Sequence, residues 1–592
     1  MTIPLICEEI AASLDQTDIA HCTLVSSDWN EAFSRVLWKN LFFHRQQDVA
    51  QFQRNRSVSH DGSQRAKMSP MQQGLIRNKD YVLCIHSVFC YTFQSSLLGG
   101  TQPETLTRSN TTASNNDAIL EQPFPNLVRL ETLASELHNK GIVDNTNTEK
   151  LLQFVTLNTT LTTIVLINFP LASVKTSKLL GVTLETHENL NSVTISCFKT
   201  ADRSSIRHVL RGAALGNVQK LVVICRSTVA WDDEPLAALE PTASSPFQLL
   251  PEGYQSGLKD LTLEASLTHA LDKTLLPLLR HCPNLRRLYI PQLAYIAEHQ
   301  DSIVEQDLGP ALKTWCPNLR DLDLGCSLAT DKAMVSLLNN CRDLRSLTFS
   351  SPNALGSLST QALVGFHATL ERLDIGICTG VDSKDLQLVL TSCPNLTVLK
   401  TVLTMESSSG NENGHGGHGR YHDLCEARIE IQDLPLGAVP AWVCLKLRVL
   451  QVGFSGFTSL GGVHVSDQNE IEISATVHRY VDHIYSQLSK LTELRTLVLA
   501  GEREVEGNGI TSAAPTVKVP AMFDFSLSGG LNQLESLHHL QELDLTNFPQ
   551  DKIADDEVVW MKTHWPRLQR VIGYNGKQHF DRAKAAKSVT IV

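Results

Sequence analysis

The chain has 592 residues and a net charge of -11, from 51 lysine and arginine residues against 62 aspartate and glutamate residues. This acidic balance leaves no basic excess for a phosphate backbone, so general nucleic-acid binding is disfavoured. Hydrophobic residues make up 42%, which is ample material for a packed core. The first ten residues have no basic region, and no apolar run approaches membrane-spanning length. We therefore expect a soluble intracellular protein of the cytoplasm, the nucleus or both.

Residues 1–44 begin with apolar positions at near-helical spacing. A first helix is predicted to start beside Pro4, because proline is tolerated in the first turn. A second short helix is predicted around Ile19, and Asp28 with Glu31 forms a capping-box-like start to a third. The segment therefore reads as a small three-helix unit.

This opening segment resembles an F-box. The matching positions are Ile3-Pro4, Ile10, Leu14, Asp18-Ile19, Val25-Ser26, Trp29 and Leu37-Trp38. Two of them, Ile3 and Ile19, replace leucines of the family pattern with side chains of similar volume. The resemblance implies docking onto the Skp-type adaptor of a cullin-RING ubiquitin ligase. The adaptor-binding residues that it implies are Pro4, Leu5, Ile10, Leu14, Ile19, Val25 and Trp29. The alternative is that some of these side chains fill the core of the unit or pack on the first repeats.

Residues 45–126 are expected to form a linker and an N-terminal capping repeat. The stretch 54–74 is polar, and 101–118 is rich in Thr, Ser and Asn, as surface segments are. Between them, 81–93 is apolar enough for a strand. Terminal repeats of an array are often atypical, so this strand suits a degenerate first repeat.

A leucine-rich repeat runs through residues 127–573. The pattern L-x-x-L-x-L starts at Leu258 and recurs after 27, 34, 25, 26 and 26 residues. These clearest copies start at Leu258, Leu285, Leu319, Leu344, Leu370 and Leu396. Weaker copies start at Leu127, Leu161, Leu190, Val218, Leu447, Leu494, Leu540 and Leu568. About fourteen units can be counted.

The repeat predicts a solenoid, because a unit of this size cannot bury its leucines without neighbours. Helical spacing between the strands is clear in 330–341, where Asp331 is placed to cap the first turn, and in 381–393. We therefore predict an α/β leucine-rich-repeat solenoid with a curved parallel sheet and helices on its convex side, preceded by the three-helix F-box.

Several of the fourteen cysteines follow the repeat. Cys-Pro-Asn-Leu occurs at 282–285, 316–319 and 393–396, and in this the chain resembles the cysteine-containing subclass of leucine-rich repeats. We interpret these cysteines as small buried hydrophobic residues at a repeat corner, without metal or redox chemistry. A chain of this length with no secretory signal also gives no reason to expect disulfides.

Three wide gaps predict loop insertions near 226–257, 403–445 and 454–492, and 574–592 is expected to be a C-terminal tail. The middle insertion contains the zinc-ligand types His415, His418, His422 and Cys425. A glycine-rich loop does not pre-position such ligands, and the tract lacks a partner pair at finger spacing. We therefore predict a disordered loop and no metal site.

The side chains that alternate with the strand leucines are expected on the concave face of the sheet. As target-binding residues we predict Asp260, Glu264, Arg287, Tyr289, Asp321, Asp323, Arg372, Asp374 and Lys400, with Thr262, Ser346 and Thr348 on the same face. Five acids against three bases favour a protein target with a basic or mixed patch. The alternative is that these side chains are only solvated.

The sequence contains no phosphate-binding loop, no H-E-x-x-H and no G-x-S-x-G, so we expect neither catalysis nor a cofactor. The leading hypothesis is a substrate-recognition subunit of a Skp-cullin-F-box ubiquitin ligase. The alternative is a leucine-rich-repeat scaffold or inhibitor without a ligase. A third and less favoured class is a GTPase activator, which would need a loop arginine that the sequence does not single out.

Overall fold

The structure is a computed structural model of the whole chain. It describes residues 40–43, 87–90, 127–133, 145–167, 169, 171, 174–197, 203–225, 250–265, 275–290, 303–324, 330–349, 355–376, 378, 380–401, 427–434, 441–455, 467–500, 525–545, 555–572 and 590–591. The chain divides into two compact units, Met1–Arg287 and Leu288–Val592.

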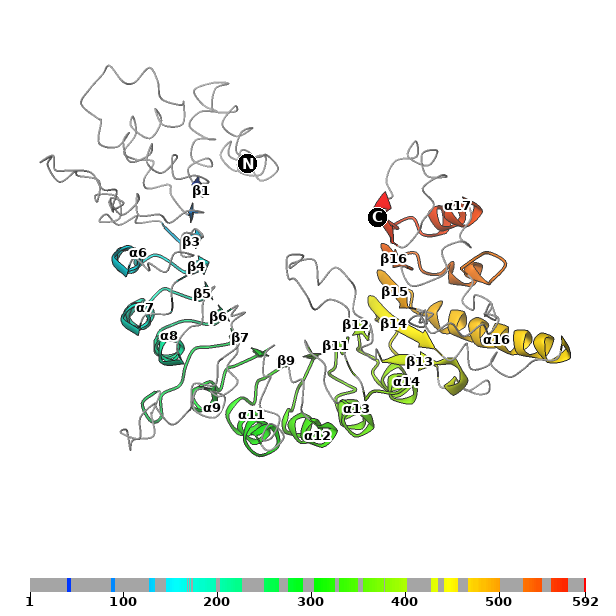
Figure 1. Ribbon diagram of the computed structural model, residues 1–592, viewed down its shortest axis with the longest axis horizontal. Helices are drawn as coiled ribbons and strands as arrows, with labels where there is room; N and C mark the ends of the chain where they lie inside the picture. The colour runs from blue at the N-terminus through cyan, green and yellow to red at the C-terminus, as the bar shows by residue number, and fades with distance from the viewer. Residues whose placement is uncertain are drawn as a thin grey trace, which may run out of the picture. The chain divides into compact units, whose positions relative to one another are not determined.

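Unit 1 contains a parallel sheet in which every strand pairs with the next strand along the chain (Figure 1). Its strands are β1 (Asn40–Phe43), β2 (Ser87–Cys90), β3 (Arg129–Leu133), β4 (Thr163–Ile167), β5 (Ser192–Cys197), β6 (Lys220–Cys225) and β7 (Asp260–Ala265). The helices are α6 (Asn145–Leu157), α7 (Val174–Thr186), α8 (Arg203–Leu215) and α9 (Leu276–Leu279). In Figure 1, α6, α7 and α8 lie on the same face of this sheet.

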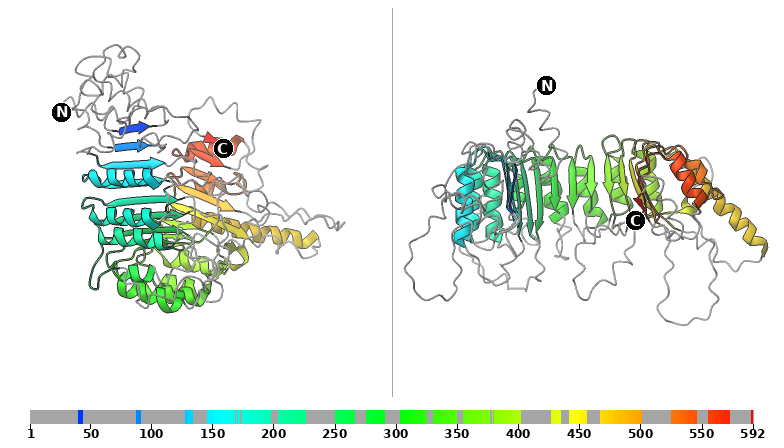
Figure 2. Two further views of the ribbon diagram at one scale, coloured as in Figure 1. Left: turned by 60° about the vertical axis from the view of Figure 1, so that its left-hand side comes forward. Right: turned by 90° about the horizontal axis from the view of Figure 1, so that it is seen from above.

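Unit 2 repeats the plan with parallel strands. Its strands are β9 (Asp321–Leu324), β10 (Ser346–Thr348), β11 (Arg372–Asp374), β12 (Val398–Lys400), β13 (Arg428–Glu430), β14 (Val449–Ser455), β15 (Thr496–Ala500), β16 (Glu542–Asp544), β17 (Arg570–Ile572) and β18 (Thr590–Ile591). Strand β8 (Arg287–Ile290) spans the boundary between the units. Figure 2 shows the strands of each unit stacked side by side.

The helices of unit 2 lie between successive strands of the chain. They are η7 (Ile303–Leu308), α11 (Gly309–Trp315), α12 (Asp331–Asn340), α13 (Ser357–Val364), α14 (Ser383–Ser392), η10 (Ile431–Asp433), α16 (Asp467–Leu488), η11 (Leu531–Leu534) and α17 (Asp555–His564). Helices α11 to α14 lie on one face of strands β9 to β12 (Figure 1). The order strand, turn, helix, strand is therefore present in both units, as the repeat predicts.

The repeat leucines form the core. In β9 the side chains of Leu322 and Leu324 are buried, and Leu319 in the preceding turn is buried with them. Each of the fourteen predicted segments contains a strand that begins two residues after its first leucine or valine. The prediction of an α/β leucine-rich-repeat solenoid is thus confirmed in its parallel sheets and in the helices on one face.

The start of α12 corrects one detail of the prediction. The helix is capped by Thr330, whose Oγ1 accepts a hydrogen bond from the backbone N–H of Ala333 at 3.4 Å. Asp331, which we expected in that role, reaches the next helix along the chain and accepts from the backbone N–H groups of Gly356, Leu358 and Ser359. A carboxylate can stabilise the unpaired N–H groups at the start of its own helix or of a neighbouring helix. Asp331 binds those at the start of α13.

The wide gaps contain more regular structure than the predicted loops. Two strands pair with β14 one after the other: β12 pairs with its residues Val449–Gln451, and β13 pairs with its residues Gly453–Ser455. Residues 428–430, within the expected insertion 403–445, are therefore part of the sheet. Likewise, α16 occupies 467–488 of the expected loop 454–492. Residues 590–591, within the expected tail, pair with β17, and 40–43, at the end of the expected helical unit, form β1.

Candidate protein-binding face

The sheet face opposite the helices is here called the open face. Along a strand successive side chains point to opposite faces, so residues that alternate with buried leucines lie on the open face. In β9, Asp321 and Asp323 are partly exposed and alternate with buried Leu322 and Leu324. The same alternation holds in β10, β11 and β12.

Strand register aligns the open-face side chains of unit 2 in two rows. The first row is Asp321, Ser346, Arg372 and Val398, and the second is Asp323, Thr348, Asp374 and Lys400. All the residues predicted from the sequence between β9 and β12 are thus brought together on one face. Neighbouring strands lie about 4.8 Å apart, so the rows place polar and charged groups at close, regular spacing.

Ion pairs connect part of this set. Asp374 Oδ2 lies 3.5 Å from Arg372 Nη2 and 4.0 Å from Lys400 Nζ. The side chains of Arg372 and Lys400 are 44% and 30% exposed, so water screens both pairs. Three carboxylates and two cations therefore form a mixed surface with a small acidic excess, as the sequence predicts.

The other predicted residues lie on β7 and β8, with Asp260, Glu264 and Arg287 in unit 1 and Tyr289 in unit 2. Asp260 and Glu264 are partly exposed on β7, alternating with buried Leu261 and Leu263. Arg287, the first residue of β8, places its Nε 3.6 Å from Asp260 Oδ1. Tyr289 follows two positions further along β8 and is partly exposed. The alternation of these residues is confirmed, whereas their role in binding stays a prediction.

The open face of unit 1 also contains partly exposed apolar side chains that sequence reasoning missed. Val165 and Ile167 of β4 and Val222 and Ile224 of β6 are partly exposed, and β5 between them presents Thr194 and Ser196. The signal in the sequence was the continuous apolar run in each strand, such as LVVIC at 221–225. Such runs are typical of strands buried on both faces, so their alternate residues are not recognised as surface.

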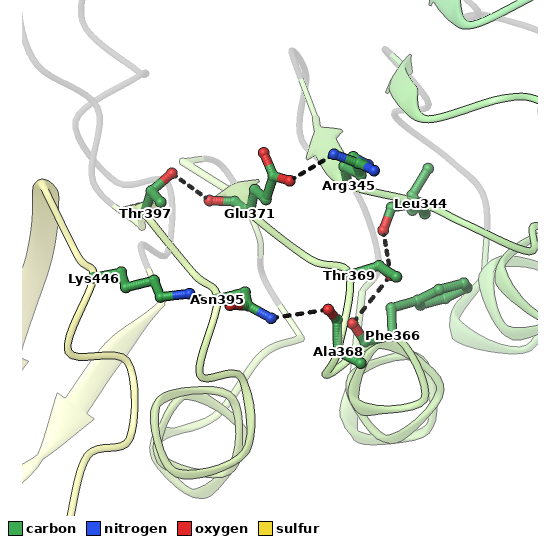
Figure 3. Close-up of polar contacts among 9 residues, drawn as sticks. All are labelled: Leu344, Arg345, Phe366, Ala368, Thr369, Glu371, Asn395, Thr397 and Lys446. Carbon is green, nitrogen blue, oxygen red and sulfur yellow. Dashed lines mark hydrogen bonds and ion pairs between the residues drawn. The ribbon is translucent and has the colours of Figure 1, made fainter.

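Polar contacts between turns fix the strands that display this face (Figure 3). Thr397 Oγ1 donates to the backbone oxygen of Glu371 at 2.8 Å, and Thr369 Oγ1 donates to that of Leu344 at 2.9 Å. On the same side, Asn395 Nδ2 donates to the Ala368 oxygen at 2.9 Å. Each bond joins one repeat to its neighbour, 25 to 27 residues away in the chain. Hydrogen bonds between neighbouring turns therefore hold the strands of the open face in position.

Carboxylates make corresponding connections at the helix starts. Burial opposes ionisation of Asp331, but hydrogen bonds from Ser359, Gly356 and Leu358 outweigh it and hold the pKa of this carboxyl below its ordinary value. Asp385 in α14 accepts from Ser357 Oγ of α13 at 2.9 Å. There burial is the larger effect, and the pKa of the Asp385 carboxyl is raised despite its hydrogen bonds from Asp382 and Ser357.

The cysteines at the repeat corners are buried thiols, which confirms the burial predicted from their spacing. Cys282, Cys316, Cys341 and Cys393 are all free and buried. Burial raises the pKa of Cys282 and Cys341 to about 12 and that of Cys393 to about 11. The thiols of Cys282, Cys341 and Cys393 are therefore protonated near neutral pH and poor nucleophiles.

Other predicted residues lie outside the described part of the chain. These are the adaptor-binding set Pro4, Leu5, Ile10, Leu14, Ile19, Val25 and Trp29, and the loop residues His415, His418, His422 and Cys425. Among the described residues, no group of three or more His, Cys, Asp or Glu side chains is arranged to hold a metal ion. None of the helices in the described ranges has the length and apolarity to cross a membrane.

Comparison with known proteins yields structural likenesses but no sequence match. No protein-family model matches the chain, and no curated protein matches its sequence. A solved structure entitled "Crystal structure of Rad7 and Elc1 complex in yeast" is similar to it, with 11% sequence identity and a TM-score of 0.36. The likeness covers 79% of this chain and 80% of the other.

Proposed function

We propose that this chain is a substrate-recognition subunit of a Skp-cullin-F-box ubiquitin ligase. In this proposal residues 1–44 bind the Skp-type adaptor, and the open face binds the target protein. The F-box resemblance of the opening residues supports the first contact. The geometry of the open face supports the second. Ubiquitin transfer would take place on other subunits, so no catalytic residue is required of this chain.

One observation supports target binding most directly. Asp321, Asp323, Arg372, Asp374 and Lys400 lie in register on neighbouring parallel strands, with their side chains on one face. Rigid strands hold such groups in place before binding, so little conformational freedom is lost when a partner docks. Charges of both signs in a fixed pattern select a partner with the complementary pattern and speed its association. A target with a basic or mixed patch fits this surface.

Two matched sets of substitutions test the two contacts separately. In full-length protein, Ile10→Asp with Leu14→Asp is expected to abolish co-purification of the Skp-type adaptor and to leave target capture intact. Asp321→Lys with Asp323→Lys is expected to weaken target binding by tenfold or more, because like charges then face the basic patch, and to leave adaptor binding intact. Co-purification and identification of bound proteins measure both effects.

A charge change away from the open face serves as the control. Lys332 on α12 has a side chain that is 79% exposed, and Lys332→Glu is expected to change neither contact. If the adaptor remains bound after the change at Ile10 and Leu14, and also after deletion of residues 1–44, the assignment of the adaptor contact to these residues is wrong. If no adaptor co-purifies with the unchanged protein, the ligase proposal is wrong. Target capture without any adaptor would then favour a leucine-rich-repeat scaffold or inhibitor.

A further inference from the structure

Two cysteines of unit 1 face each other across neighbouring strands. Cys197 is the last residue of β5 and Cys225 is the last residue of β6, and the two are register partners. Their Sγ atoms are 2.6 Å apart. Parallel neighbours have Cα atoms about 4.8 Å apart, which lies within the span of about 4.4–6.8 Å that disulfides bridge.

A hydrogen bond joins the two thiols. Cys197 donates its S–H to Cys225 Sγ, and its sulfur also lies 3.4 Å from the backbone oxygen of Ile224. The hydrogen bond to Cys225 and burial both raise the pKa of the Cys197 thiol, so this residue keeps its proton. Cys225 Sγ accepts this hydrogen bond, so the two sulfurs are already in contact.

Access also distinguishes the two sulfurs. Cys225 is 5% exposed and Cys197 is 2% exposed. Both exposed fractions are low, so an oxidant reaches these thiols slowly. Cys225 is the more accessible of the two, and it is also the hydrogen-bond acceptor. Its greater exposure assigns Cys225 the first reaction with the oxidant.

We propose that Cys197 and Cys225 form an oxidative modification site, at which a hydroperoxide converts the two thiols into a cross-strand disulfide. With hydrogen peroxide, the Cys225 sulfur attacks one peroxide oxygen and gives up its proton, the O–O bond breaks, and a sulfenic acid forms while the leaving hydroxide takes up that proton as one water. Cys197 sulfur then attacks the sulfenic sulfur, the S–O bond breaks, and the leaving hydroxide takes the Cys197 proton as a second water. Two thiols thereby lose two electrons and two protons, and the peroxide is reduced.

Corner cysteines provide the contrast within the same fold. Cys282 and Cys341 donate to the backbone oxygens of Leu278 and Leu337 in their own helices, at 3.3 Å and 3.6 Å. Their thiols point along a helix and not toward the register partner of a neighbouring strand. They are buried to a similar extent, so burial alone does not separate them from Cys197 and Cys225.

The test uses the folded full-length protein and hydrogen peroxide. After treatment, free thiols are blocked, the chain is digested without reduction, and the peptides are identified by mass. A linked Cys197–Cys225 peptide is expected to become the main form of both peptides and to disappear on reduction. Cys197→Ser is expected to remove the link and leave Cys225 singly oxidised, whereas Cys282→Ser is expected to leave the link unchanged.

Three results would overturn the proposal. The first is that Cys197 and Cys225 both stay as blocked thiols while other cysteines of the chain oxidise. The second is that each is oxidised singly, at the rate of Cys282, with no link between them. The third is that the link forms only in urea, which would place the reaction in the unfolded chain. Hydrogen exchange of β5 and β6 during treatment verifies that the sheet stays folded.

Discussion

Neighbouring helices are held together differently in the two units. In unit 1, α7 and α8 approach until their backbones touch, because Gly181 and Gly212 present no side chain at the contact. In unit 2, α12, α13 and α14 are connected at their starts by side chains, from Asp331 to the N–H groups of α13 and from Ser357 to Asp385. One repeat plan thus accommodates two kinds of contact.

This difference has a physical consequence. Contact between glycine backbones depends on shape alone and does not change with pH, but it leaves no space for an added atom. A carboxylate that accepts several N–H bonds tolerates small shifts of its partner helix, yet it loses strength once it is protonated. Unit 1 is therefore expected to be sensitive to side-chain size, and unit 2 to acidity.

The largest effect is expected from Gly212→Val in α8. A Cβ at this position would lie 2.6 Å from Gly181 Cα, closer than real Cβ atoms come to backbone. The helices must separate, so the change is expected to destabilise unit 1 by about 3 kcal/mol or more. Hydrogen exchange is expected to lose protection in α7 and α8 and to keep it in α12 to α14.

Gly257→Ala is the matched control in the same unit. A Cβ there would meet only the Val218 oxygen, at 3.9 Å, which is ordinary contact. We expect a change within about 0.5 kcal/mol. Equal losses for Gly212→Val and Gly257→Ala would show that the close approach of α7 and α8 does not matter for stability.

The next effect is expected at the carboxylates of unit 2. Asp331→Asn removes the charge that three N–H groups of α13 contact, at an expected cost of about 1–2 kcal/mol near neutral pH. The folded-state pKa of Asp331 is lowered from its ordinary value of 3.8. Its contribution is therefore complete above pH 3.8 and is lost as the pH falls through the folded value. Urea unfolding at a series of pH values measures the gap between wild type and variant.

Asp385→Asn is expected to show the opposite trend. The folded-state pKa of Asp385 is raised above 3.8, so the folded chain favours the protonated carboxyl. Ionisation then costs stability as the pH rises through the interval above 3.8, and the neutral amide avoids this cost. The stability gap should move in favour of the variant as the pH increases. Parallel pH profiles for the two variants would contradict the assignment of burial as the dominant effect at Asp385.

The sequence predicted the strands well because burial of leucine determines them locally. The motif LRDLDL places Leu322 and Leu324 on one face, so Asp321 and Asp323 had to lie on the other. Helix α12 was equally predictable from the spacing of its buried leucines. Helix α16 was missed, since it lies in a gap between leucine motifs, where length alone suggested a loop.

The residue spacing of the motif could not predict the side-chain contacts between repeats. Asp331 contacts Gly356, and Cys197 contacts Cys225, 25 and 28 residues further along the chain. Such pairs depend on the register of parallel strands and on helix position, and these follow from packing of the whole array. Local rules placed Asp331 on its own helix, where Thr330 is the actual cap. The apolar open-face residues of β6 were missed because a continuous apolar run such as 221–225 does not show which of its residues are exposed.

The smallest effect is expected where two exposed side chains join neighbouring repeats. Arg345 Nη1 lies 3.0 Å from Glu371 Oε1, and the two side chains are 46% and 49% exposed. Water screens such a pair, so Arg345→Ala should cost at most about 0.5 kcal/mol, and less in high salt. Thr397→Val, which removes a bond to the backbone oxygen of Glu371, should cost about 1 kcal/mol at any salt concentration. If Arg345→Ala proves the costlier change in urea unfolding, surface charge and not the turn-to-turn hydrogen bonds would hold the repeats of unit 2 in register.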